Sequence, residues 1–243
     1  MNKSLISLVI TSALVMPGTV LADGNYYHGV PFHDDDNEDV SYNYRDYSSG
    51  ASVKTFKVTG SAVDGSELGA LIYDTEVRTY DRTIPGIVSY SRDRKVGGAG
   101  GVGVNYSVIT MDKSGDELLL TKFERYSSNG LTLKETRTMT PGVVFRTENM
   151  GVGKTFGSYS SLDSSKAGLS SVIQSVTLLG VEDVTVPAGS FTGCIKLLRH
   201  RNSERLGGEY DRINWFCPNN VGLVKSVTMQ TTSTVLELES ITP

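Results

Sequence analysis

The fold is decided by a stretch that begins Val184-Thr185-Val186-Pro187-Ala188-Gly189-Ser190-Phe191 and ends at Lys225. Its valines and Phe191 supply apolar contacts, Pro187 removes a donor from a strand ladder, and Gly189 permits a tight turn. The chain returns through Trp215-Phe216-Cys217-Pro218 before its last apolar run. We therefore predict a turn framework made of Pro187, Gly189, Phe191, Trp215, Pro218 and Gly222.

The two halves of this stretch predict one strand register. Joining Cys194 to Cys217 across an antiparallel hairpin places His200 opposite Asp211 and turns the chain near residues 204–207. Several cross-strand pairs are satisfied together, which is how a register is specified.

The N-terminus predicts export. One lysine, Lys3, precedes an apolar run over residues 5–15, and Val20-Leu21-Ala22 forms a small-residue cleavage site. The run is shorter than the roughly 20 apolar residues that span a bilayer. We expect residues 1–22 to be a cleaved signal peptide, and the mature protein to be periplasmic or secreted in a bacterium and not membrane-spanning.

Export bears on the two cysteines. Oxidising compartments favour disulfides, so we predict one bond between Cys194 and Cys217. The alternative is a pair of separate buried thiols.

Length and charge limit the remaining classes. The precursor carries a formal net charge of −4, and such a chain has no basic field to hold nucleic acid. Residues 51–243 fit a single β domain, because all-β domains commonly run to about 200–250 residues.

Residues 23–50 predict a flexible arm rich in tyrosine and aspartate. Aliphatic residues are nearly absent there, so little burial offsets the entropy of ordering. The acidic run offers carboxylates that suit calcium but lacks the spacing of a calcium loop. We predict no metal site and no cofactor, and the candidate ligands, were a metal to bind, are Asp34, Asp35, Asp36 and Asp39.

From residue 52 onward the sequence alternates β-rich segments with turns. No segment sustains a helical period. The predicted fold is all-β and mainly antiparallel, a large curved meander sheet or open half-barrel with at most one or two short helices. The expected strands cover residues 53–59, 70–80, 87–95, 102–111, 117–127, 131–139, 172–179, 182–186, 223–230 and 234–241.

Three details of this meander are open to a structural check. Pro85-Gly86 and Pro141-Gly142 each suit the centre of a type II turn. A three-residue loop with Gly130 in the left-handed conformation would set Glu124 opposite Lys134 and avoid like-charge pairs. The one short helix that we expect covers residues 162–169.

Catalytic motifs are scarce. His200 and Asp211 resemble a base and its orienter, but a histidine beside an aspartate on a hairpin is usually a surface pair. No nucleophile elbow, Cys-x-x-Cys or zinc-binding motif is present. Because catalytic motifs are so scarce, we predict that the protein is not an enzyme.

The charge pattern also bears on membrane insertion. Charges such as Lys122 and Arg125 occur on both faces of one strand, which argues against an outer-membrane barrel.

The stretch from Val184 to Lys225 also resembles a group of exported bacterial proteins, mostly of unknown function. The resemblance rests on Val184-Thr-Val-Pro-Ala-Gly-Ser-Phe191 with its following cysteine, on Trp215-Phe216-Cys217-Pro218 and on Gly222-Leu223-Val224-Lys225. It covers roughly residues 140–240. The fold of these proteins looks like the curved sheet of the LolA/LolB lipoprotein carriers, which implies a concave face that binds lipid.

Three functional hypotheses follow. The preferred one is an exported, non-enzymatic protein whose concave sheet binds an apolar ligand or an envelope protein. The second is a surface or matrix interaction protein that uses the acidic, tyrosine-rich arm. The third and weakest is a hydrolase that uses His200 and Asp211.

Overall fold

The computed structural model describes residues 26–27, 30–31, 41–43, 46–50, 53–60, 73–97, 101–203, 208–229 and 233–243. The expected signal peptide and the acidic run from Asp34 to Asp39 lie outside these residues. No helix of the described chain is long and apolar enough to cross a membrane.

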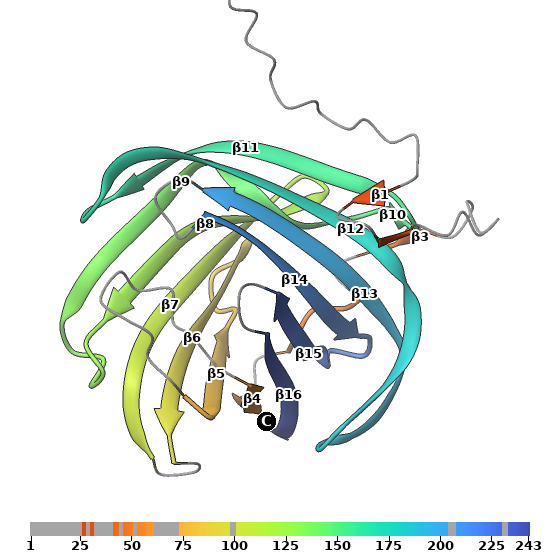
Figure 1. Ribbon diagram of the computed structural model, residues 1–243, viewed down its shortest axis with the longest axis horizontal. Helices are drawn as coiled ribbons and strands as arrows, with labels where there is room; N and C mark the ends of the chain where they lie inside the picture. Colours follow the sequence, from red (N-terminus) through yellow and green to blue (C-terminus); the bar gives the residue numbers. More distant parts are fainter. Residues whose placement is uncertain are drawn as a thin grey trace, which may run out of the picture.

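Twelve antiparallel strands form a closed barrel. The first six form a meander, as Figure 1 shows from orange to green. They are β4 (Val53–Gly60), β5 (Thr75–Asp81), β6 (Ile87–Val96), β7 (Val102–Ser114), β8 (Glu117–Tyr126) and β9 (Leu133–Thr147).

The second six continue the meander and close it. They are β11 (Thr155–Ser164), β12 (Gly168–Val186), β13 (Gly189–Ser203), β14 (Gly208–Cys217), β15 (Gly222–Met229) and β16 (Thr234–Thr242). β9 pairs with β11, and β16 pairs with β4 in a register that includes Leu236 opposite Val58. The predicted curved sheet is thus present, and closure leaves it without a free edge.

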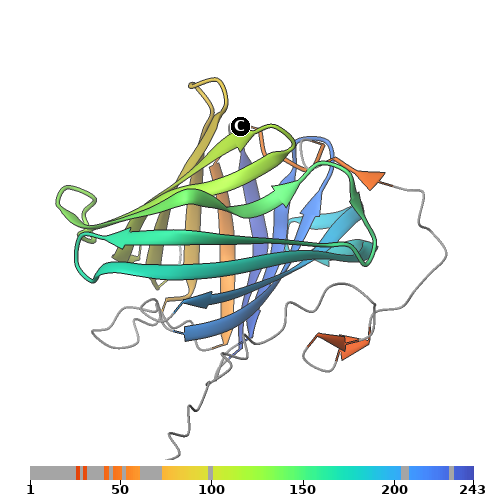
Figure 2. The same cartoon turned by 90° about the horizontal axis from the view of Figure 1, so that it is seen from above.

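Small sheets lie outside the barrel. β3 (Ser41–Tyr42) pairs with β10 (Met150–Gly151), and β1 (Tyr26–Tyr27) pairs with β2 (Val30–Pro31). Figure 2 shows the barrel from a second direction.

The two ends of the barrel carry different connections. At the first end lie the β4–β5, β6–β7, β13–β14 and β15–β16 connections. At the second end lies the turn between β12 and β13, and apolar side chains fill the barrel there. This apolar core includes Tyr47, Phe56, Met150, Phe216, Leu223 and Leu238.

The stretch that the sequence singles out contributes a disulfide and a turn to this second end. A disulfide joins Cys194 to Cys217, and His200 lies opposite Asp211, as the sequence predicts. The Ala188 N–H donates to the Leu238 carbonyl of β16 over 2.9 Å. The Pro187–Gly189 turn therefore ties the β12–β13 hairpin to a strand that is not its neighbour in the sheet.

Part of the predicted flexible arm is packed structure. The Tyr47 side chain is buried, and its carbonyl accepts a 2.9 Å hydrogen bond from Arg146. Ser49 donates to the Val221 carbonyl, and the Gly50 N–H donates to Asn220. These contacts pack residues 46–50 against the barrel end, where the hydrophobic core offers Tyr47 the apolar burial that the arm lacks by itself.

The expected helix over residues 162–169 is wrong. Those residues form the end of β11, a turn, and the start of β12. Gly168 takes φ +72°, which suits a hairpin turn. Leu162 is fully buried in the barrel wall, so tertiary pairing overrides a weak helical preference.

Two expected turns have different outcomes. The Ile87 N–H donates to the Ile84 carbonyl, and Gly86 has φ +81°, so Pro85-Gly86 does form a turn. Pro141-Gly142 instead lies inside β9, next to a cis Thr140–Pro141 peptide. The β8–β9 ladder is irregular there, which allows proline within the strand.

The predicted register of the β8–β9 hairpin is also wrong. Gly130 has the expected positive φ, but Glu124 lies opposite Thr136 and Arg125 lies opposite Glu135. A bulge after Arg125 shifts the strand. It brings Arg125 within 3.6 Å of the Glu135 carboxylate, an attraction that the sequence argument did not include.

Candidate functional site

A cavity of about 210 Å³ lies inside the barrel, and its lining includes Tyr73 and Leu236 of the apolar core. Residues of β5, β6, β13 and β14 form much of its wall, and β7, β8, β9, β11, β15 and β16 complete it. The volume is below the roughly 300–1,000 Å³ of pockets for drug-sized ligands. The cavity therefore suits a small molecule.

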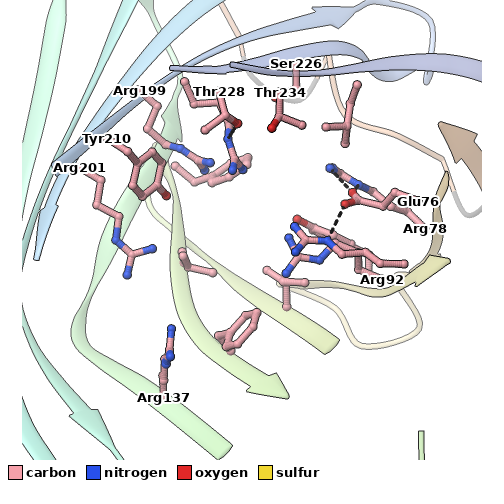
Figure 3. Close-up of a pocket in the computed structure, with 18 of the residues that line it drawn as sticks. Glu76, Arg78, Arg92, Arg137, Arg199, Arg201, Tyr210, Ser226, Thr228 and Thr234 are labelled. Carbon is pink, nitrogen blue, oxygen red and sulfur yellow. Dashed lines mark hydrogen bonds and ion pairs between the residues drawn. The ribbon is translucent and has the colours of Figure 1, made fainter. Parts of the chain in front are cut away.

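Arginine dominates the lining. Seven arginines face the cavity, and Glu76 is the one carboxylate among its lining residues in the described chain. The arginines are Arg78, Arg92, Arg94, Arg137, Arg199, Arg201 and Arg212. Figure 3 labels five of them: Arg199 and Arg201 lie across from Arg78 and Arg92, and Arg137 lies apart from both pairs.

Three of these arginines have carboxylate partners. Glu76 accepts hydrogen bonds from Arg78 over 2.7 Å and from Arg94 over 3.1 Å. Arg137 donates to Glu135 over 2.6 Å. Burial alone would raise the pKa of Glu76, but Arg78 and Arg94 outweigh it and hold the pKa well below its ordinary value. Glu76 is thus an anion that is already neutralised.

Four arginines have no carboxylate partner in the described part of the chain. Arg92 donates to the Ser107 hydroxyl and Arg212 to the Thr228 hydroxyl. The Nε atoms of Arg199 and Arg201 are buried and donate to no described group. Burial lowers the pKa of Arg199 to about 10, so it is still a cation at neutral pH. Buried charges are normally paired, so these four leave room for an anion.

Tyr210 lies among the arginines that lack a carboxylate partner, and its side chain hydrogen-bonds to Arg201. The Arg212 guanidinium carbon is 5.5 Å from its ring centroid, and that of Arg201 is 6.0 Å away. Burial alone would raise the pKa of Tyr210, but Arg201, Arg199 and Arg212 lower it to about 7. Near neutral pH, the tyrosine partly supplies the negative charge that this wall lacks.

One arc of the cavity is mostly apolar. Its apolar side chains come from β7, β8, β9 and β11, and they are Ile109, Leu120, Phe123, Met139, Phe145 and Leu162. Arg137 of β9 is the cation in this arc, with its guanidinium carbon 5.5 Å from the centroid of the Phe123 ring. The opposite arc, from β15 and β16, presents mainly the hydroxyls of Ser226, Thr228 and Thr234. The cavity thus combines positive charge with an apolar surface.

The residues that the sequence singled out lie elsewhere. His200 Nδ1 is 2.8 Å from Asp211 Oδ1, and its Nε2 is 3.4 Å from Glu209. Side chains alternate along β13, so His200 points away from the face that carries Arg199 and Arg201. The pair forms a hydrogen-bonded contact and does not line the cavity.

Trp215 likewise lies apart from the cavity. Its indole N–H donates to Glu182 over 2.5 Å, and the ammonium groups of Lys196 and Lys225 lie 5.3 and 5.8 Å from its ring. None of the residues of the predicted turn framework lines the cavity.

The sequence argument missed the arginines. A usable signal was present, because Arg92 and Arg94 are two residues apart in one strand and Arg199 and Arg201 are two apart in another. Residues i and i+2 share a face of a strand. Two such pairs would have predicted cationic stripes, although not that the stripes face each other.

Comparison with known proteins gives only distant likenesses. No family model matches the chain, and no curated protein matches it. One similar solved structure is a protein assigned as a lipoprotein from Parabacteroides distasonis, with 14% identity and a TM-score of 0.44, covering 80% of this chain and 97% of the other. Another is a protein assigned as exported, with a YmcC-like fold, from Bacteroides fragilis, with 14% identity and a TM-score of 0.49, covering 81% and 97%.

Proposed function

We propose that this protein is an exported, non-enzymatic β-barrel that binds a small anionic ligand inside its barrel. The observation that carries the proposal is the charge of the lining, where four buried or half-buried arginines lack carboxylate partners among the described residues. Arginine presents a planar fork of N–H donors that matches carboxylate, sulfate and phosphate oxygens. An anion would satisfy groups that are otherwise costly to bury.

This proposal changes the expected ligand. The sequence predicted an apolar ligand on a concave face, whereas seven arginines line the cavity. A purely apolar molecule would take water away from these cations without compensating them, which costs free energy. An anion is favoured for this reason.

The test uses inorganic sulfate as the probe and isothermal titration calorimetry as the readout. Wild-type protein is compared with Arg199→Gln/Arg212→Gln, which removes two unpaired cations, and with Lys196→Gln/Lys225→Gln, which removes two cations outside the cavity. We expect the first variant to bind sulfate at least about tenfold more weakly, about 1.4 kcal/mol, and the second to bind as wild type does. Equal affinities in all three proteins, or no binding to wild type, would contradict the proposal.

A further inference from the structure

The positions of the unpaired arginines relative to the apolar arc restrict the ligand further. Arg199 lies on β13, and its guanidinium carbon is 4.9 Å from the centroid of the Phe145 ring on β9. Arg92 lies on β6 and is 5.8 Å from the centroid of Phe123 on β8. Each of these two cations therefore lies directly beside an apolar surface.

Packing against an aromatic ring leaves the N–H groups of these arginines available to bind an anion. A guanidinium that packs near an aromatic ring still has N–H groups at its planar edge. The Arg199 Nε is buried and has no acceptor in the described chain. An anion bound there would hold any substituent that it carries close to Phe145.

The accessible part of the apolar arc is aromatic. Phe123 and Phe145 are half-buried, whereas Ile109, Leu120, Met139 and Leu162 are already packed in a buried cluster behind them. A bare inorganic anion would leave the two rings facing water. A ligand with an apolar group would cover them, with a gain of about 25 cal/mol per Å² buried.

The arginines of the β13–β14 wall, the apolar arc and the cavity volume together are complementary to one kind of molecule. We propose that the ligand is a small amphiphilic oxyanion, with its charged head at Arg199, Arg201 and Arg212 and a ring or short alkyl group against Phe123, Phe145 and the other residues of the apolar arc. This inference rests on the proposed function, since it specifies the anion. A cavity of about 210 Å³ excludes a long acyl chain and favours a single ring.

Arg78 and Arg94 are not part of this head site. Glu76 accepts from both, so the site prefers the β13–β14 wall, where no carboxylate competes among the described lining residues. On that wall, a bound anion competes with the side-chain oxygen of Tyr210 for Arg199, Arg201 and Arg212.

The experiment compares three probes on the wild-type protein at pH 6.5 by calorimetry. Methyl sulfate and phenyl sulfate carry the same head and the same charge, and phenol carries the ring alone. We expect phenyl sulfate to bind at least about tenfold more tightly than methyl sulfate, and phenol to bind more weakly than phenyl sulfate. Arg199→Gln/Arg212→Gln should weaken phenyl sulfate binding and leave the affinity for phenol nearly unchanged.

The outcomes separate the two proposals. If methyl sulfate binds as tightly as phenyl sulfate, the protein binds anions but the amphiphile is excluded. If neither sulfate ester binds, the proposed function fails together with this inference. If phenol binds as tightly as phenyl sulfate, the ring alone accounts for binding, and the proposal that the arginines bind a charged head is wrong. A thermal unfolding curve for the double variant shows whether a loss of binding reflects a loss of fold.

Discussion

The Nε atom of Arg78 donates a 2.7 Å hydrogen bond to the carboxylate of Glu76 inside the barrel. The Glu76 side chain is fully buried, and Arg94 contacts its second oxygen at 3.1 Å. A single buried anion thus compensates two cations on neighbouring strands. The arrangement separates the neutralised part of the cavity wall from the part that is still cationic.

Glu76→Gln should strongly destabilise the fold. The change removes the carboxylate that accepts hydrogen bonds from Arg78 and Arg94, and breaking a buried ion pair in this way costs about 3–5 kcal/mol. Urea unfolding measures the difference. Glu237→Gln is the matched control, because its 2.9 Å bridge to Lys225 is partly exposed and should be worth less than about 1 kcal/mol. Similar losses in both variants would mean that the buried anion has no special role.

Gly222→Ala should detach the arm residues from the barrel end. Gly222 has φ +66°, and an added Cβ would lie 2.7 Å from the Ser49 nitrogen. Strain and overpacking together should cost at least about 2 kcal/mol.

Gly115→Ala is the control for Gly222→Ala. Gly115 has φ +56°, and an added Cβ there would meet nothing within 4 Å, so this variant suffers the backbone strain alone. Chemical denaturation should show a smaller loss for Gly115→Ala, and protease cleavage near residues 46–50 should increase only in Gly222→Ala. Equal losses would show that the contact with Ser49 is unimportant.

Removing the disulfide should lower stability without changing the fold. Cys194 and Cys217 are 23 residues apart, and a loop of that length corresponds to about 3 kcal/mol of unfolded-state entropy. Cys194→Ala/Cys217→Ala should therefore unfold at lower urea concentration and keep its circular dichroism spectrum. In the native protein, neither thiol should react with a maleimide before reduction, and reaction of both would contradict the bond.

Anion affinity should fall as pH rises through about 7. The pKa of Tyr210 is about 7, so the phenol is neutral below this pH and becomes a phenolate above it. The phenolate competes with a bound anion for Arg199, Arg201 and Arg212. Phenyl sulfate keeps its charge over this range, and its affinity for wild type should fall at least about fivefold between pH 6 and pH 8.5.

Tyr210→Phe isolates this titration from others. The variant cannot form a phenolate, so its affinity for phenyl sulfate should vary less with pH and exceed that of wild type at pH 8.5. If the two proteins show the same pH profile, another group controls binding.

Much of the barrel wall could be predicted because it depends on local patterns. Alternation and turn residues located most strands, including the observed β4 and β16 almost to the residue. We expected two strands over residues 172–179 and 182–186, whereas β12 continues through Gly180 with a register shift. Pro141 misled in the same way, because an irregular ladder accepts a residue that normally ends a strand.

The sequence by itself determined the β character of the chain, the cysteine pairing and the cross-strand contact of His200 with Asp211. These depend on neighbours in one hairpin, whose register follows from side-chain alternation and turn chemistry. Only the tertiary structure decided that the sheet closes and that Arg92 of β6 faces the same cavity as Arg199 of β13. Closure joins strands that are far apart in the chain, and the charge of the enclosed space depends on which faces point inward together.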